Sequence, residues 1–286
     1  MTFQVLYSAD LHGNEAQYRK LVDEALHRGA RAVVIGGDIL PKGLPHSAFI
    51  SGQREFVKNR LPALVGPLKE AGIPLYLMLG NDDCAANLDA LASGKNIHGR
   101  RLPLTGSIDI VGYGFVPVTP FGIKDWEKYD FSTCPPELAA RYATRKAANY
   151  NLRGWKTDSG AWKEFHFTPA LELRESIQLD LEDRLYRTDA GRTLYVVHTP
   201  PDDTCLDVTA YGQHVGSLAL RRFIEETQPL MTLHGHVHET VEMTGEFMER
   251  IGRTVCASPG NTDLGETLRA LWFDAERPEG VQRLTL

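Results

Sequence analysis

The chain begins with the stretch FQVLYSADLHGN, residues 3–14, in which a short apolar run leads directly into polar residues. Residues 3–8 are rich in aromatic and branched side chains, which favour the extended backbone of a β-strand. Asp10 and His12 follow two positions apart, and residues two apart in an extended segment point the same way. We therefore expect a carboxylate oxygen and an imidazole nitrogen to meet just beyond the end of a strand.

The same arrangement, an apolar run followed by polar residues, recurs four more times along the chain. The polar residues in these places are Asp38, Asn81 with Asp82 and Asp83, His198, and the pair His236 and His238. Layered α/β proteins carry such residues on the loops just beyond their strand ends. Carboxylate, amide and imidazole groups together form a binding set for divalent metal ions. The sequence thus predicts a metal site at one edge of a sheet.

Strand and helix signals alternate over the first part of the chain, which is typical of parallel strands covered by helices. Strands are expected at 3–8, 32–35, 74–79, 107–115, 194–197, 230–233, 254–257 and 268–273. Helices are expected at 15–27, 53–71 (interrupted by Pro62), 84–92, 168–186 and 217–226. The helix over 168–186 rests on a capping Thr168 and on apolar residues that repeat every four positions.

Residues 121–165 lack a clean periodicity and contain nine aromatic side chains. A structureless loop of this length is uncommon within a domain, so this segment is interpreted as an insertion that packs over the core. Its aromatics form either a lid that stacks on a flat group of a substrate or a small apolar core and homo-oligomer contact. We expect one domain over residues 1–286 with the insertion at about 120–193.

The composition excludes several classes of protein. With 286 residues, 42% of them hydrophobic and 24% charged, the chain reads as globular, and its net charge of -6 argues against a large nucleic-acid-binding surface. Four cysteines without a CxxC pair argue against a disulfide framework and a Cys-rich zinc site. We find no signal-peptide pattern and no apolar stretch near the roughly 20 residues that cross a bilayer. A cytoplasmic location without a membrane partner is therefore expected.

The five motifs, in their order along the chain, resemble those of the calcineurin-like metallophosphoesterase family. The resemblance covers the chain except for roughly residues 120–193. It implies a four-layer αββα sandwich, an α/β fold in which two mixed β-sheets lie face to face with helices outside. It also implies a phosphoric ester hydrolase whose substrate is a small phosphate ester.

The resemblance further implies two divalent metal ions, for which Mn, Fe, Zn, Ni and Co all fit the ligands. One ion would be held by Asp10, His12, Asp38 and His238, and the other by Asp38, Asn81, His198 and His236. Two such ions clamp a phosphoryl group and generate a hydroxide from bound water.

The chain departs from the family at Asp82, where a His usually follows the Gly-Asn pair and assists the leaving group. A carboxylate near two cations stays ionised and repels an anionic phosphate. Three explanations remain open. The substrate is a phosphodiester, which carries one negative charge, rather than a phosphomonoester such as a nucleotide; another group serves as acid; or the fold is kept as a metal-binding scaffold for protein interactions.

Several further residues are candidates for the site. His214, His234 and His12 are candidates for the catalytic acid by residue type, and Asp82 occupies the catalytic position itself. His234 extends the alternation of His236 and His238, and a hydrogen-bonded role behind the metal ligands is its other interpretation. Asn14 either contacts a substrate phosphate or caps the helix that begins there.

Overall fold

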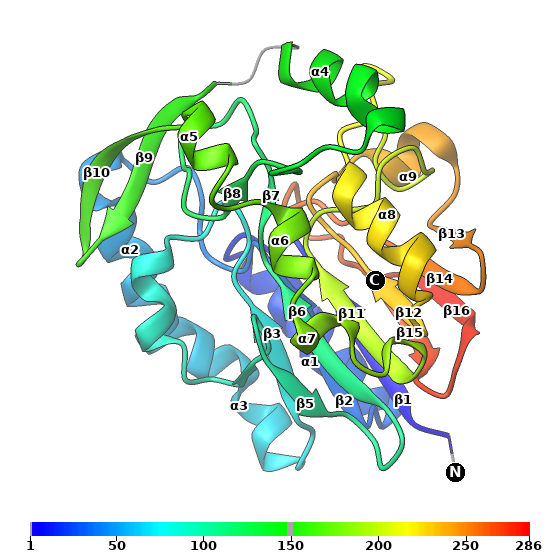
Figure 1. Cartoon of the computed structure of the whole chain (residues 1–286). Coiled ribbons are helices and arrows are strands. Elements are labelled where there is room, and N and C mark those ends of the chain that lie inside the picture. The colour runs from blue at the N-terminus through cyan, green and yellow to red at the C-terminus, as the bar shows by residue number, and fades with distance from the viewer. Residues whose placement is uncertain (1, 148–150) are drawn as a thin grey trace.

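The computed structural model describes residues 2–147 and 151–286 (Figure 1). Two six-stranded mixed sheets form its centre. In order across the first sheet lie β16 (Arg277–Thr285), β15 (Arg269–Asp274), β1 (Gln4–Ser8), β2 (Ala32–Gly36), β3 (Leu75–Met78) and β4 (Lys95–Asn96). The second contains β13 (Met248–Ile251), β14 (Thr254–Ala257), β12 (Met231–Leu233), β11 (Thr193–Val197), β6 (Asp109–Tyr113) and β5 (Arg101–Pro103).

The strands that carry the predicted motifs run parallel within each sheet. In the first sheet β1, β2 and β3 pair in parallel, and in the second β11 pairs in parallel with both β6 and β12. Because the carboxyl ends of parallel strands meet at one edge, the loops that follow them lie together. Three of the four strands at the margins of the sheets, β16, β13 and β5, pair antiparallel, whereas β4 pairs parallel with β3.

Apolar side chains form three large clusters, one between the two sheets and one on the outer face of each sheet. Between the sheets, alternate residues of β1, β2 and β3 pack against β11 and β12. The outer face of the first sheet is covered by α1 (Glu15–Arg28) and α3 (Leu61–Glu70), and that of the second by α6 (Ile177–Leu181) and α8 (Leu218–Thr227). The predicted four-layer αββα sandwich is confirmed. Each sheet has two apolar faces, so one face packs on the other sheet and the other face is covered by helices.

The predicted helix over 53–71 is divided in the structure. It consists of α2 (Phe49–Glu55), a π-helical turn at Phe56–Arg60, and α3, with Pro62 in the first turn of α3. The π-helical turn directly before Pro62 interrupts the regular α-helical hydrogen bonds where proline has no N–H group to donate. The short helix predicted at 84–92 is a 3₁₀ segment at Ala85–Ala90.

The prediction of one helix over 168–186 is wrong. The structure has three short helices, α5 (Pro169–Glu172), α6 and α7 (Arg184–Arg187). Each begins with its own cap, because the side chains of Thr168, Ser176 and Asp183 accept hydrogen bonds from backbone N–H groups of the following turn. The apolar repeat does not form one face either, since Leu173 is 71% exposed.

The aromatic insertion folds into small elements. These are β7 (Val116–Pro117), β8 (Glu127–Lys128), α4 (Ala139–Ala147) and the hairpin of β9 (Arg153–Asp158) and β10 (Ala161–His166). Phe131 and Tyr142 of the insertion pack on the second sheet, whereas the tryptophans of its hairpin lie against His46 and Phe49. Four of the nine aromatics, Trp126, Tyr129, Phe131 and Tyr142, are buried, whereas Tyr150 lies outside the described residues. These four rings therefore belong to the apolar core of the protein. The homo-oligomer contact that we expect from the insertion stays a prediction.

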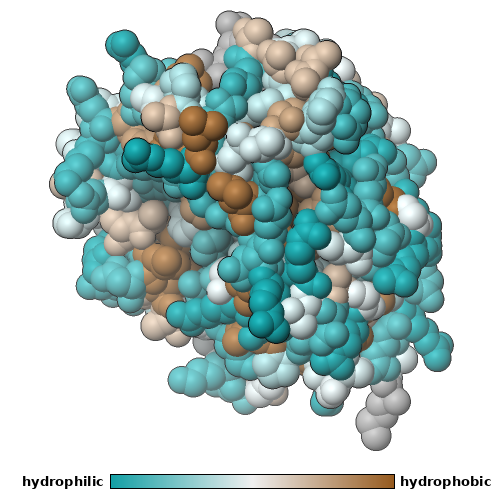
Figure 2. Space-filling model, viewed as in Figure 1, coloured by the Kyte–Doolittle hydropathy of each residue, from teal (hydrophilic) through white to brown (hydrophobic). Residues whose placement is uncertain are grey.

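The surface in Figure 2 is mainly hydrophilic, with hydrophobic residues in small separate groups. Among the helices of the described residues, none has both the length and the apolar character needed to cross a membrane.

Candidate metal centre

The seven predicted ligands lie on loops that leave five strands at the edge shared by the two sheets. Asp10 and His12 follow β1, Asp38 follows β2 and Asn81 follows β3. From the second sheet, His198 comes directly after β11, and His236 and His238 lie on the loop after β12. The sheets therefore face each other with polar loops at one end, and each sheet contributes part of the cluster.

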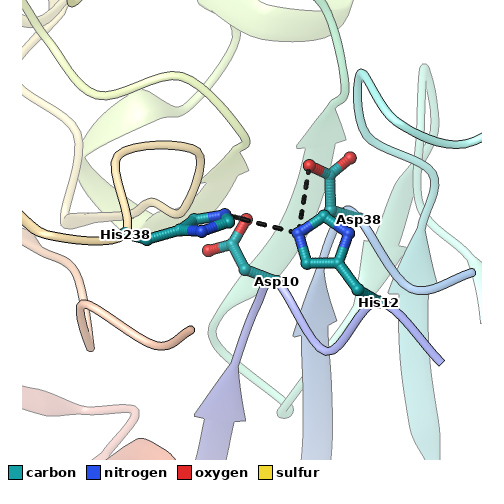
Figure 3. A group of neighbouring side chains, drawn as sticks. All are labelled: Asp10, His12, Asp38 and His238. Carbon is teal, nitrogen blue, oxygen red and sulfur yellow. Dashed lines mark hydrogen bonds and ion pairs between the residues drawn. The ribbon is translucent and has the colours of Figure 1, made fainter. Parts of the chain in front are cut away.

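A first group contains Asp10, His12, Asp38 and His238 (Figure 3). One nitrogen or oxygen of each residue lies within 4.8 Å of those of the other three. The Nε2 atoms of His12 and His238 are 3.3 Å apart, and His12 Nε2 is 3.8 Å from Asp38 Oδ2. Figure 3 shows His238 reaching across from the opposite loop toward the other three side chains. These donor atoms point at one common position, as the ligands of an ion do.

A second group contains Asp38, Asn81, His198 and His236. Asn81 Oδ1 lies 3.1 Å from His198 Nε2 and 2.7 Å from His236 Nδ1. His198 Nε2 is also 3.3 Å from Asp38 Oδ2. Asp38 thus belongs to both groups, as a carboxylate that bridges two ions does.

The backbone of the cluster is strained. Asp10, His12, Asp38 and His236 have φ values of 57°, 44°, 51° and 69°, in the left-handed region that residues with a Cβ rarely adopt. Each such residue costs on the order of 1–3 kcal/mol and persists only where the surrounding structure enforces it. Such residues concentrate at functional sites, and here four of the seven predicted ligands have this conformation.

Two glycines allow the ligand side chains to approach the neighbouring backbone. A Cβ on Gly80 would lie 2.4 Å from Asp38 Oδ1 and 2.7 Å from His198 Nε2. A Cβ on Gly37, whose φ is 105°, would lie 2.5 Å from His198 Nδ1. Glycine is required at both positions because any other residue would occupy the space of a ligand.

The donor set fits divalent metals in its hydrogen bonding as well. His198 Nδ1 lies 2.9 Å from the carbonyl of Gly36, which can only accept, so Nδ1 carries a proton. Nε2 faces the cluster and would give up its own proton to ligate an ion. His12 Nδ1 is buried and has no hydrogen-bond partner in the described part of the chain. Buried, nearly inaccessible carboxylates at Asp10 and Asp38 require compensating positive charge, which metal ions supply.

The protein's own groups already favour ionised carboxylates here. Burial alone raises the pKa of Asp38, but the His198 ring outweighs it, so the pKa of Asp38 lies well below its usual range. Burial lowers the pKa of His12 to about 4 and that of His236 to about 3. For His198, burial is outweighed by the carboxylate of Asp38, and the pKa rises to about 10. His12 and His236 are thus neutral near pH 7, the form in which a histidine binds metal.

Asp82 lies at the rim of the cluster. Its Oδ2 is 3.8 Å from His12 Nδ1, its Oδ1 accepts a hydrogen bond of 3.1 Å from Asn81, and its side chain is 27% exposed. Burial and the charge of Asp38 raise the pKa of Asp82 to about 7 among the protein's own groups. Bound cations would lower this pKa, as the sequence analysis expects.

Three other candidates do not join the cluster in the structure. Both ring nitrogens of His234 are occupied, Nδ1 by the carbonyls of Val197 and Thr199 and Nε2 by Thr232 at 2.8 Å. His234 is fully buried, which lowers its pKa to about 4, so a structural role replaces the catalytic one.

The other two candidates have local partners. His214 binds Asp207 at 2.7 Å on the loop after His198, and the described residues show no hydrogen bond or ion pair between it and the seven ligands. Asn14 caps α1 by accepting from Gln17 and donates to the carbonyls of Asp263 and Gly265. The capping interpretation of Asn14 is the one that the structure supports.

Lys42 is a site residue that the sequence analysis missed. Its ammonium group forms an ion pair of 2.9 Å with Asp263 and is 35% exposed. Its charge acts to lower the pKa values of His12, Asp82 and His238, although burial affects all three more strongly. Lys42 therefore lies beside the rim of the cluster. Its place on the loop after Asp38 does not distinguish it in the sequence, because its partner Asp263 lies more than 200 residues further along the chain.

Comparisons with known proteins agree with this geometry. Residues 3–240 match the sequence profile of the calcineurin-like phosphoesterase family. No curated protein matches the sequence. Among solved structures, the protein TT1561 of Thermus thermophilus is similar at a TM-score of 0.56 and 16% identity, with 100% of this chain and 99% of that chain covered.

A dimetal phosphatase from Danio rerio is similar at a TM-score of 0.51 and 13% identity, with 99% of this chain and 98% of that chain covered. At these identities the two structures show a shared fold. The family profile extends over most of the chain and includes all five polar motifs. The chain belongs to the calcineurin-like phosphoesterase family, which hydrolyses phosphoric esters and uses divalent metal ions in a dinuclear centre.

Proposed function

We propose that this protein is a metal-dependent phosphodiesterase that acts on a small phosphodiester. The observation that carries the proposal is the convergence of seven donor side chains from five loops into two groups that share Asp38. When bound, two divalent ions clamp a phosphoryl group and lower the pKa of water to supply a nucleophile. Manganese is the metal that we would test first.

Side chains of the protein would hold the ions and bind the phosphoryl group. Asp10 and Asp38 stay ionised, while the neutral rings of His12 and His236 offer lone pairs. Lys42, at the rim, is paired with Asp263, and the remaining N–H groups of its ammonium would donate charge-assisted hydrogen bonds to a phosphoryl oxygen.

Asp82 favours a diester over a monoester. With bound cations its carboxylate is ionised, and it repels the second negative charge of a monoester. A diester brings one negative charge only, so the repulsion is smaller. The rival is a phosphomonoesterase or nucleotidase, which Lys42 supports because its cation offsets that second charge.

The test compares two model esters. Metal-stripped protein is reloaded with Mn²⁺ and assayed on bis-p-nitrophenyl phosphate and on p-nitrophenyl phosphate. We expect faster cleavage of the diester, abolished in Asn81→Ala and unchanged in the control Asn59→Ala, an exposed asparagine of the π-helical turn. Faster cleavage of the monoester would establish the rival. No cleavage of either by protein with two bound metals would favour a protein-interaction scaffold.

A further inference from the structure

Two loops at the rim of the centre, residues 39–43 with Lys42 and residues 80–84 with Asp82, are joined by side chains outside the predicted ligand set. Asp83 is fully buried, and its carboxylate accepts from the backbone N–H groups of Ile39, Leu40 and Gly80 at 2.8–3.0 Å. These bonds hold the start of the first loop against the second. They end two residues before Lys42.

Gln53 of α2 makes the next connection. Its side-chain amide nitrogen donates to the carbonyl of Pro41 at 3.1 Å and to the carbonyl of Asp82 at 2.8 Å. Its amide oxygen accepts from the N–H of Cys84 at 2.8 Å. One fully buried side chain thus binds the residue before Lys42, Asp82 itself, and the second residue after Asp82.

The loop has few other restraints at this point. In the described part of the chain, the bond from Gln53 is the last hydrogen bond to the loop's backbone before Lys42. Gly43 follows with a φ of 73° and open space around its α-carbon. On the other side, Gly13 packs so closely on Pro41 that a Cβ would lie 2.6 Å from its ring. Gln53 therefore anchors the backbone at Pro41 from one side and Gly13 packs on it from the other, while the ammonium group of Lys42 is held by its ion pair with Asp263.

We propose that Gln53 is a positioning residue of the phosphoesterase centre, which fixes the distance between Lys42 and Asp82 and thereby the space for the phosphoryl group and its leaving group. This inference rests on the proposed function for its catalytic consequence. Displacement of a catalytic group by about 1 Å lowers the rate by as much as 100-fold. Loss of the Gln53 amide should therefore affect turnover although it touches neither metal nor substrate.

The test uses Gln53→Met, which keeps the length of the side chain and removes its three hydrogen bonds. Asn87→Leu is the matched control, because the Asn87 side chain is also fully buried and donates to the carbonyl of Ile50 in α2. In the described part of the chain that side chain forms no hydrogen bond with either loop, and the substitution keeps the backbone bond from the Asn87 N–H to the carbonyl of Cys84. Gln53→Glu is the second variant, since it keeps the acceptor for Cys84 and loses the donor to Pro41 and Asp82.

The first readout is kcat on a series of aryl phosphodiesters with leaving groups of increasing pKa. We expect kcat to fall about 10- to 100-fold in Gln53→Met, with little change in KM and the larger losses at the poorer leaving groups. A variant that is merely less stable loses rate equally on all substrates. Two results would overturn the proposal. One is an unchanged rate in folded Gln53→Met, and the other is a loss of rate that is the same for every ester and is also found in Asn87→Leu.

The second readout is independent of activity. Trypsin cleaves after Lys42, and a loop released from Gln53 should be cut several-fold faster in Gln53→Met and Gln53→Glu than in the wild type or Asn87→Leu. Cleavage at the wild-type rate in both Gln53 variants would contradict the positioning role. An inactive wild type with faster cleavage in the variants would instead overturn the proposed function and leave Gln53 as the residue that holds this loop.

Discussion

At the scale of single residues, Gly80 shows how little free space surrounds the predicted bridging carboxylate. The Gly80→Ala substitution would place a methyl carbon 2.4 Å from Asp38 Oδ1, on a loop that Asp83 fixes to the backbone of Ile39 and Leu40. We expect activity to fall at least about 100-fold, because the methyl group would displace the Asp38 carboxylate, and a shift of about 1 Å in a catalytic group lowers the rate by about this factor. Metal content and activity are the measurements. Gly66→Ala, on α3 with open space at its Cβ, is the control and should keep both.

Lys42 offers a second test at this scale. In Lys42→Met the charge-assisted hydrogen bond to substrate is lost, which is worth about 1.5–3 kcal/mol, or roughly 10- to 100-fold in kcat/KM. The loss should be larger for p-nitrophenyl phosphate than for its diester, because the monoester carries more charge. Lys58→Met, an exposed lysine of the π-helical turn, should behave as the wild type. Equal kinetics in Lys42→Met and the wild type would remove Lys42 from the substrate site.

The sequence alone predicts the cluster but not what surrounds it. The seven predicted ligands each follow an apolar run, so a strand and its end identify them without any knowledge of contacts. Lys42 and Gln53 carry no such signal, because their partners Asp263 and Asp82 are brought to them by tertiary packing. His234 continues the alternation of its neighbours and is therefore a candidate by sequence, although its ring nitrogens are bound elsewhere.

At the scale of elements, the start of α8 depends on a buried acid of the insertion. Asp130 accepts from the Ser217 hydroxyl and from the N–H groups of Leu218 and Ala219. Burial nevertheless raises the pKa of Asp130 to about 6. The folded protein thus binds this proton more tightly than the unfolded chain, so the contribution of Asp130 to stability falls as the pH rises from about 4 to about 6 and is constant above.

The variant Asp130→Asn should remove this dependence. We compare the free energies of unfolding of the wild type and the variant. Their difference, wild type minus variant, should decrease by about 2–3 kcal/mol between pH 4 and pH 7. Urea unfolding followed by circular dichroism at several pH values measures it, and the other titrating groups cancel in the difference. A difference that is flat with pH would show that Asp130 has an ordinary pKa.

Elements are predictable where one local pattern dominates. Continuous apolar runs indicate the central strands, whose two faces are both buried. The three caps within 168–186 are as visible in the sequence as the apolar repeat, yet the repeat suggests one helix. The β9–β10 hairpin has no buried face to impose alternation, since all its residues are exposed or half-buried.

At the scale of the whole molecule, metal binding should stabilise the fold, because the two groups exist only when both sheets are in place. A ligand at about 100 times its dissociation constant adds about 2.7 kcal/mol. We expect the Tm to rise by roughly 5 °C when Mn²⁺ is added to chelator-treated protein, as measured by calorimetry. Asp38→Asn, which removes the shared ligand charge, should show little of this rise. A wild-type Tm that is insensitive to Mn²⁺ would argue against both groups as metal sites.

The left-handed backbone at Asp10, His12, Asp38 and His236 has a consequence for how this protein can lose its activity. The left-handed conformation of these four residues lowers the stability of the fold, so replacing one of them with glycine removes a ligand and at the same time relieves backbone strain. The relief of strain offsets stability that is lost with the metal, so we expect an inactive variant of this kind to stay folded. A screen that measures only the amount of folded protein would not detect such variants. An assay of metal content or turnover would detect them.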